Sequence, residues 1–169
     1  MIKVEITSLA GVLKITLDIF EDHRGQYIQL YNEADYGPPE MRPIKFVQDD
    51  ISVSYKNVLR GIHGDSETWK LISCLHGRIY LVVVDCDEHS SDFNKWEAFI
   101  ITATNGVQVL VPPEHGVAHL VLSDKAIFHY KQSTYYSPGK QFTYGYDDKR
   151  FNIKWPIKNP ILSERDANA

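Results

Sequence analysis

A single glycine divides two apolar runs in Lys70-Leu71-Ile72-Ser73-Cys74-Leu75-His76-Gly77-Arg78-Ile79-Tyr80-Leu81-Val82-Val83-Val84-Asp85. Short runs rich in Val, Ile and Tyr predict β-strands, and Gly77 between them predicts a tight turn. Outward from this stretch, comparable segments recur at intervals of about ten residues. They are residues 12–19, 26–31, 44–54, 96–102, 106–111 and 126–133. This rhythm predicts an all-β fold.

Helical patterning is scarce in this chain. Residues 32–36 suit one helical turn, and the segment after Trp155-Pro156 suits an extended wrap or a short helix. Pro112-Pro113 marks a break between strands, because proline cannot donate to a central ladder. We expect a meander that closes into a jelly-roll (cupin, double-stranded β-helix) barrel, whose open mouth can hold one ligand. No repeat or linker divides the sequence, so we expect a single domain over residues 1–169.

Composition narrows the class of protein. The 169 residues are 43% hydrophobic, which is enough for one compact core. The net charge of -4 comes from 18 basic and 22 acidic side chains without a basic stripe, which argues against nucleic acid as a partner. Cys74 and Cys86 form no CxxC pair or disulfide framework, which fits a reducing cytoplasm. Residues 1–6 lack the apolar core of a signal peptide and no segment has membrane-spanning length, so we expect a soluble cytoplasmic protein.

A histidine among cations is the first chemical signal. Arg60-Gly61-Ile62-His63 closes a strand-like segment, and Lys70 follows seven residues later. A neutral imidazole can take a proton from the carbon next to a carbonyl while a nearby cation stabilises the enolate that forms. A lone histidine at a strand end is more often a structural residue than a base, so this interpretation depends on partners elsewhere in the chain.

A metal site is not expected in the mouth of the barrel. The usual arrangement there needs two histidines and a carboxylate that converge from a rigid sheet. His63 is followed by Gly64-Asp65, where the second histidine of an HxH pair would stand. Asp65 and Glu67 lie in a polar stretch and are expected to be solvated turn residues. The sequence therefore predicts that the protein uses no metal.

Eight short motifs follow one another along the chain. They are Phe20-Glu21-Asp22-His23-Arg24-Gly25, Phe46-Val47-Gln48-Asp49-Asp50, Val58-Leu59-Arg60-Gly61-Ile62-His63, Lys70-Leu71, Leu122-Ser123-Asp124, Tyr130-Lys131 with Tyr135-Tyr136, Trp155-Pro156, and Leu162-Ser163-Glu164-Arg165-Asp166. In this order the chain resembles the dTDP-4-dehydrorhamnose 3,5-epimerases over nearly its whole length. The resemblance implies a homodimeric jelly roll, a nucleotide-linked 4-keto-6-deoxy sugar as substrate, and no cofactor.

The resemblance also implies catalytic roles. His63 would take the proton from the carbon beside the 4-keto group, and Asp166 would orient that histidine. Tyr130 would be the acid on the opposite face of the sugar, and Lys70 and Arg60 would stabilise the enolate oxygen or bind phosphate. An aspartate on one ring nitrogen fixes the tautomer and raises the basicity of the other nitrogen. Otherwise Asp166 is a charge on a frayed tail and Tyr130 a packing residue.

The nucleotide end of the site is implied by resemblance alone. Its residues would be Arg24, Gln48 and Arg60 at the diphosphate, and Tyr27 and the region of Tyr146 near the base. Arg24 would come from the neighbouring subunit. Arg24 could instead pair with Asp22, because guanidinium forks on phosphate and on carboxylate share the same geometry.

Several positions depart from the family pattern. Gln29 stands where a glutamate is frequent, and Asp50 where an asparagine is usual. An ungapped match puts Val117 where a histidine commonly stands, with His115 and His119 two residues to either side. We expect these three residues to share one face of a strand, so that His119 could replace the missing histidine. These changes are similar to the family branch that epimerises GDP-linked 4-keto heptoses.

The sequence therefore predicts a cofactor-independent epimerase of a nucleotide-diphosphate 4-keto sugar. We expect GDP-4-keto-6-deoxy-heptose, used for capsular or other surface polysaccharide, as the preferred substrate and a dTDP-4-keto-6-deoxyhexose as the second choice. Inversion at C3, at C5 or at both carbons stays open. So do a 3,4-ketoisomerase and a non-catalytic sugar-nucleotide binding module, since a fold does not by itself deliver an activity.

Overall fold

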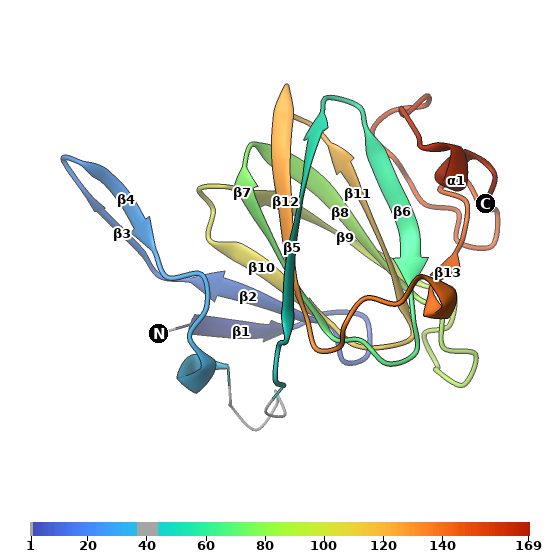
Figure 1. Ribbon diagram of the computed structural model, residues 1–169, viewed down its shortest axis with the longest axis horizontal. Helices are drawn as coiled ribbons and strands as arrows, with labels where there is room; N and C mark the ends of the chain where they lie inside the picture. Colours follow the sequence, from blue (N-terminus) through green and yellow to red (C-terminus); the bar gives the residue numbers. More distant parts are fainter. Residues whose placement is uncertain (1, 37–43) are drawn as a thin grey trace.

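The computed structural model describes residues 2–36 and 44–169, and these residues form two large antiparallel sheets (Figure 1). The first has the order β1 (Ile2–Ile6), β2 (Leu13–Leu17), β10 (Val107–Val111), β7 (Lys70–His76), β12 (Lys125–Gln132) and β5 (Gln48–Tyr55). The second has the order β13 (Phe142–Thr143), β6 (Leu59–Gly64), β11 (His115–Val121), β8 (Arg78–Asp85) and β9 (Trp96–Thr102). The predicted all-β jelly-roll class is confirmed.

Helices in the described residues are short. They are η1 (Glu33–Asp35), η2 (Pro138–Lys140) and α1 (Glu164–Ala167). The turn expected near residue 34 and the short helix expected in the tail are both present. Among the described residues, no helix has the length and apolar character needed to cross a membrane.

The apolar stretch around Gly77 does not form a hairpin. β7 belongs to the six-stranded sheet and β8 to the five-stranded sheet, so the chain crosses between sheets at Gly77. The backbone there has φ 77, and a Cβ would lie 2.1 Å from the carbonyl oxygen of Lys125, so only glycine fits. The expected meander is wrong in this respect, because β10 lies between β2 and β7, and β11 lies between β6 and β8.

β8 explains why the second apolar run has no polar alternation. One set of its side chains, including Ile79, Leu81 and Val83, packs in the core between the sheets. The alternate residues Val82 and Val84 pack in a second cluster with the carboxyl-terminal segment. A strand that is buried on both faces needs apolar residues at every position. The carboxyl-terminal segment is therefore part of the packed structure.

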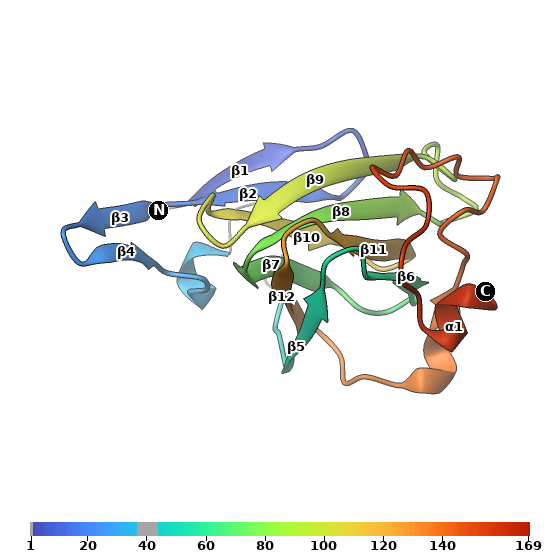
Figure 2. The same cartoon turned by 90° about the horizontal axis from the view of Figure 1, so that it is seen from above.

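A two-stranded hairpin extends away from the barrel in both views (Figure 1, Figure 2). It consists of β3 (Ile19–Asp22) and β4 (Gly25–Ile28). Phe20 and Tyr27 lie opposite each other in the hairpin and are 61% and 64% exposed. Large exposed apolar side chains on a projecting element are typical of an interaction surface.

Candidate active site

A pocket of about 540 Å³ opens between the two large sheets. β5, β7 and β12 supply one wall, β6 and β11 supply the other, and the tail closes one side with Ser163, Arg165 and Asp166. Of the twelve site residues that we predicted, eight line this pocket. They are Gln48, Asp50, Arg60, His63, Lys70, His119, Tyr130 and Asp166.

The imidazole of His63 meets a buried carboxylate from the tail. His63 Nε2 lies 2.6 Å from Asp166 Oδ1, and Asp166 is 4% exposed. The short helix α1 holds that carboxylate, because its N-cap Ser163 accepts a hydrogen bond from the backbone N–H of Asp166. A carboxylate only accepts, so Nε2 carries the proton and Nδ1 is left as the basic nitrogen.

The tail that carries Asp166 is fastened to β6. The backbone N–H of Ile161 donates to the carbonyl of Asn57, and that of Leu59 donates to the carbonyl of Ile161. The Arg165 guanidinium also donates to Thr143 Oγ1 on β13, which pairs with His63 in the sheet. These contacts fix the tail on β6 at Ile161 and on β13 at Arg165, and so keep the Asp166 carboxylate beside His63.

Electrostatics keep His63 neutral near pH 7. Burial lowers the pKa of His63, the charge and hydrogen bond of Asp166 oppose this, and Arg165 and Lys70 lower it further, so that the net pKa lies below the ordinary 6.5. An imidazole that is neutral at working pH can accept a proton.

Tyr130 faces the same pocket from the opposite sheet. It lies on β12, whereas His63 lies on β6. Burial, with Asp50 and Tyr136 nearby, raises the pKa of Tyr130 above 10.0, so its hydroxyl stays protonated and can donate. The pocket thus holds a base and an acid on opposed walls.

Lys70 and Asp65 form a buried ion pair beside these groups. Lys70 Nζ lies 3.9 Å from Asp65 Oδ2, and the two residues are 8% and 5% exposed. Our expectation that Asp65 is a solvated turn residue is wrong. Glu67 fits that expectation better, because it is exposed and pairs with Lys140 at 2.6 Å.

Polar side chains of β5 and β12 form a network at one end of the pocket. Asp50 Oδ2 accepts hydrogen bonds from the side-chain amides of Gln48, at 2.7 Å, and Gln132, at 2.8 Å. Gln48 in turn accepts from the backbone N–H of Tyr136, also in the pocket lining. Arg60 Nε donates to Ser54 Oγ, and its terminal nitrogens donate to no other residue that the structure describes, so they stay available to an anion.

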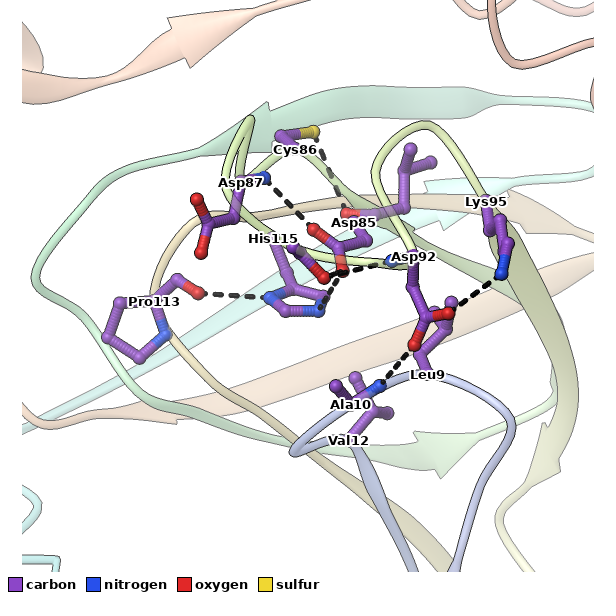
Figure 3. A network of polar contacts seen from close by, with 12 residues as sticks. Leu9, Ala10, Val12, Asp85, Cys86, Asp87, Asp92, Lys95, Pro113 and His115 are labelled. Atoms are coloured by element: carbon purple, nitrogen blue, oxygen red, sulfur yellow. Dashed lines mark hydrogen bonds and ion pairs between the residues drawn. The ribbon is translucent and has the colours of Figure 1, made fainter.

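His119 and His115 lie in different surroundings. His119 lines the pocket and stacks on Phe128 with a centroid separation of 4.0 Å, and burial lowers its pKa to about 3. His115 is not part of the lining. Its Nδ1 donates to the carbonyl of Pro113 at 2.9 Å, and its Nε2 faces the fully buried Asp85 at 3.9 Å (Figure 3). Of the two histidines that flank Val117, only His119 is placed to meet a ligand.

Four predicted site residues lie outside the pocket of a single chain. Arg24 sits at the tip of the β3–β4 hairpin and pairs with Asp22 at 2.5 Å, which is the alternative that the sequence left open. Tyr27 and Gln29 are exposed on or beside that hairpin. Tyr146 lies beyond β13, where its carbonyl accepts from Trp155 Nε1. Their roles stay predictions.

Comparison with known proteins identifies the chain. The family model described as dTDP-4-dehydrorhamnose 3,5-epimerase matches residues 6–169. The chain belongs to this family. The Escherichia coli (strain K12) enzyme of the same name is 37% identical to our epimerase over 164 residues, which cover 95% of this chain and 89% of the relative. The chain is thus an isomerase, as predicted.

Solved structures agree with this assignment. The dTDP-6-deoxy-D-glucose-3,5-epimerase of Legionella pneumophila Philadelphia 1, in complex with dTDP-4-keto-L-rhamnose, matches this epimerase with a TM-score of 0.95 and 32% identity, covering 100% of this chain and 92% of that one. NovW, a 4-keto-6-deoxy sugar epimerase from Streptomyces spheroides, matches with a TM-score of 0.96 and 28% identity, covering 100% and 86%. The GDP-heptose branch that we expected from Gln29, Asp50 and Val117 has no support among these relatives.

Some lining residues of the epimerase were not predicted. They are Ile51, Ser52, Ile72, Val117, Phe128, Gln132, Tyr136, Gln141, Ser163 and Arg165. Tyr136, Ser163 and Arg165 belong to motifs that carried the resemblance, and could have been proposed from it. The others come from strand positions or, for Gln141, from a loop, where only the folded arrangement shows which way a side chain points.

Among the described residues of the epimerase, no group of three or more His, Cys, Asp or Glu side chains could hold a metal ion. Cys74 and Cys86 are both free thiols.

Proposed function

We propose that this epimerase inverts C3, C5 or both carbons of a dTDP-linked 4-keto-6-deoxy sugar by proton removal and return. The observation that carries this proposal is the placement of the His63 and Asp166 pair and of Tyr130 on opposed walls of one pocket. Inversion needs a base on one face of the ring and an acid on the other. A protein that only binds a sugar nucleotide needs neither.

The chemistry follows from the 4-keto group, which acidifies the carbons on both sides of it. His63 Nδ1 takes the proton from one of these carbons, and the electrons of the C–H bond move onto the carbonyl oxygen to give an enolate. The Lys70 ammonium and the Arg60 guanidinium stabilise that oxygen. The Tyr130 hydroxyl returns a proton to the carbon on the opposite face, and solvent restores both side chains. Each acid-base role is worth about 10²- to 10⁴-fold in rate.

Support for a dTDP-linked sugar comes from the relatives. The family description and the ligand of the Legionella structure both name dTDP-linked compounds. No relative named above is described as acting on a GDP-linked sugar, so the experiment below compares the two nucleotides. His119, neutral at physiological pH, is the residue we assign to contact the sugar nucleotide in place of the histidine that Val117 replaces.

We further assign a homodimer in which the β3–β4 hairpin reaches the neighbouring subunit. Its exposed Phe20 and Tyr27 favour a contact, and Arg24, in the turn between β3 and β4, does not line the pocket of its own chain. In the neighbour's pocket Arg24 would exchange Asp22 for the diphosphate. A cytoplasmic location stays a prediction.

The test is exchange of solvent deuterium. The protein is incubated in heavy water with dTDP-4-keto-6-deoxyglucose or its GDP-linked counterpart, and label at C3 and C5 is measured by mass spectrometry. We expect label from the dTDP sugar and a loss of about 10²- to 10⁴-fold in His63→Asn. His76→Asn is the matched control, because His76 is exposed and outside the pocket lining.

The other outcomes of this experiment would each contradict one part of the proposal. Undiminished exchange in His63→Asn overturns the base assignment. Label only from the GDP sugar overturns the dTDP assignment. A ketone that migrates to C3 identifies a 3,4-ketoisomerase, and tight binding without label identifies a binding module.

A further inference from the structure

The turn between β6 and β7 encloses a carboxylate that the mechanism above does not use. Asp65 Oδ1 accepts hydrogen bonds from the backbone N–H groups of Glu67, at 2.9 Å, and Thr68, at 2.7 Å. Asp65 Oδ2 accepts from Gln141 Nε2 at 2.8 Å. Both oxygens are therefore fixed by neighbours from two segments, and the carboxylate cannot swing away.

This carboxylate stays ionised although it is buried. Burial raises the pKa of Asp65, but the hydrogen bonds from Glu67 and Thr68 and the charge of Lys70 outweigh it, and the net pKa lies below 3.8. A fixed negative charge thus lies beside the pocket wall at every pH at which the enzyme would work.

Lys70 depends on that charge. Burial lowers the pKa of Lys70 below 10.5, and the charge of Asp65 is the opposing influence. The other titratable groups that line the pocket are His63 across the cavity, Tyr130 and Asp50 on the strands beyond Gln132, and also Arg60, His119, Tyr136, Arg165 and Asp166. His63 and Tyr130 are neutral in the resting enzyme, and Asp50 Oδ2 is already engaged by two amides. The Asp166 carboxylate is engaged by His63, so among the described residues Asp65 is the carboxylate that forms an ion pair with Lys70.

The separation in this pair matters as much as the charge. At 3.9 Å, Lys70 Nζ and Asp65 Oδ2 form an ion pair but are too far apart for a hydrogen bond. Within the described part of the chain, Lys70 Nζ donates no hydrogen bond. Its three N–H donors are thus free for a ligand oxygen in the pocket that Lys70 lines.

We infer that Asp65 is a positioning residue, which keeps the Lys70 ammonium charged and in place while leaving its donors free for the enolate oxygen. The inference rests on the proposed function, since Lys70 has an enolate to stabilise only if the chain is an epimerase. A closer carboxylate would compete with the substrate for the same donors. A more distant one would let the buried amine lose its proton.

The test is Asp65→Asn, which keeps the size of the side chain and an oxygen for the Glu67 and Thr68 N–H groups. The amide of Gln141 can turn over to accept from the new Asn, so the turn should survive. The deuterium-exchange rate is measured against pH for wild type, Asp65→Asn and Lys70→Gln, with the melting temperature of each. Glu67→Gln is the matched control, because it removes one charge from the same turn at a residue that pairs with Lys140 instead.

We expect Asp65→Asn to lower kcat about 10- to 100-fold with a smaller change in KM, as for loss of one preorganised charge interaction. The alkaline limb of the pH-rate profile of Asp65→Asn should move to lower pH. The charge of Asp65 raises the pKa of Lys70, and this variant lacks that charge. A residue that only stabilised the fold would lower the melting temperature without moving that limb.

The outcomes separate this inference from the proposed function. No exchange by the wild type would mean that the proposed function has failed. Exchange by the wild type, loss in Lys70→Gln, and an unmoved alkaline limb in Asp65→Asn would overturn the inference alone. Full activity in Lys70→Gln would also overturn it.

Discussion

At the scale of single residues, the His63 and Asp166 pair sets which nitrogen reacts. Because the carboxylate engages Nε2, Nδ1 is the atom left with a lone pair. Burial pulls the pKa of His63 down, and Asp166 pulls it up. The carboxylate therefore both orients the base and moderates its pKa.

Replacing Asp166 by Asn should separate these two effects. The exchange rate of the wild type should rise with pH through the pKa of His63, below 6.5, because the neutral imidazole is the base. Without the carboxylate that pKa falls further, so the acid limb should move to lower pH. The plateau should fall by about 10²- to 10⁴-fold, because the tautomer is no longer fixed. A pH-rate profile of deuterium exchange measures both.

Asn in place of Asp166 keeps the backbone N–H that donates to Ser163 Oγ, so α1 and the tail should stay in place. An unchanged plateau, or an acid limb that moves to higher pH, would contradict the assigned role of Asp166.

Some residues of the site could be predicted from the sequence and others could not. The segment that carries His63 and the position of Lys70 could be read from their chemistry, and Tyr130 and Asp166 from the resemblance. Asp65 could not, because its burial depends on Gln141, which is 76 residues away and closes over the turn. A polar turn is exposed by default, and only the folded loop shows otherwise.

At the scale of elements, the absence of a side chain at Gly61 lets β6 lie close to the backbone of β11. Gly61 has φ 113, and a Cβ there would lie 2.4 Å from the carbonyl oxygen of Val117 and 2.7 Å from Cα of Ala118. Both are backbone atoms, which cannot turn aside. His63 is two residues further along the same strand.

Gly61→Ala should therefore destabilise the fold and displace the base. We expect the free energy of unfolding to fall by about 1–3 kcal/mol or more, from backbone strain together with the clash. Urea unfolding followed by fluorescence measures it. Gly139→Ala is the control, because a Cβ at Gly139 meets no described residue within 4 Å. Equal stability of the two variants would show that β6 can shift without cost.

The strands themselves were more predictable than their order. Periodicity and composition locate β7 and β8, yet nothing local reveals that they leave Gly77 for different sheets. Pairs such as Val109 with Ile72 join segments that are distant in the chain. Such pairing is decided by the whole core rather than by any single segment.

At the scale of the whole molecule, the projecting hairpin predicts sites that are shared between subunits. His63→Asn and Arg24→Ala are each expected to inactivate or weaken a homodimer. When the two variants are dissociated mildly and mixed, they should form heterodimers. In each heterodimer one pocket has both the native His63 and the native Arg24. About a quarter of wild-type activity should return, because half of the random dimers carry one intact site out of two.

The control is a mixture of His63→Asn with Lys70→Gln. Both residues line the same pocket of one chain. This mixture can therefore form an intact site only if His63 and Lys70 of one site come from different chains. Recovery in that control, or none in the first mixture, would contradict an Arg24 that acts across the interface.

The seating of the tail on β6 has a consequence for when the molecule becomes active. The carboxylate of Asp166 is synthesised 103 residues after the imidazole that it holds. A nascent chain that has emerged only through β13 already owns every strand of both large sheets and most of the cavity. Such a fragment lacks not only the carboxylate but also Phe151, Ile153 and Trp155, which pack in one cluster with Val82 and Val84 of β8, so the last residues to be synthesised complete the packing and the site together.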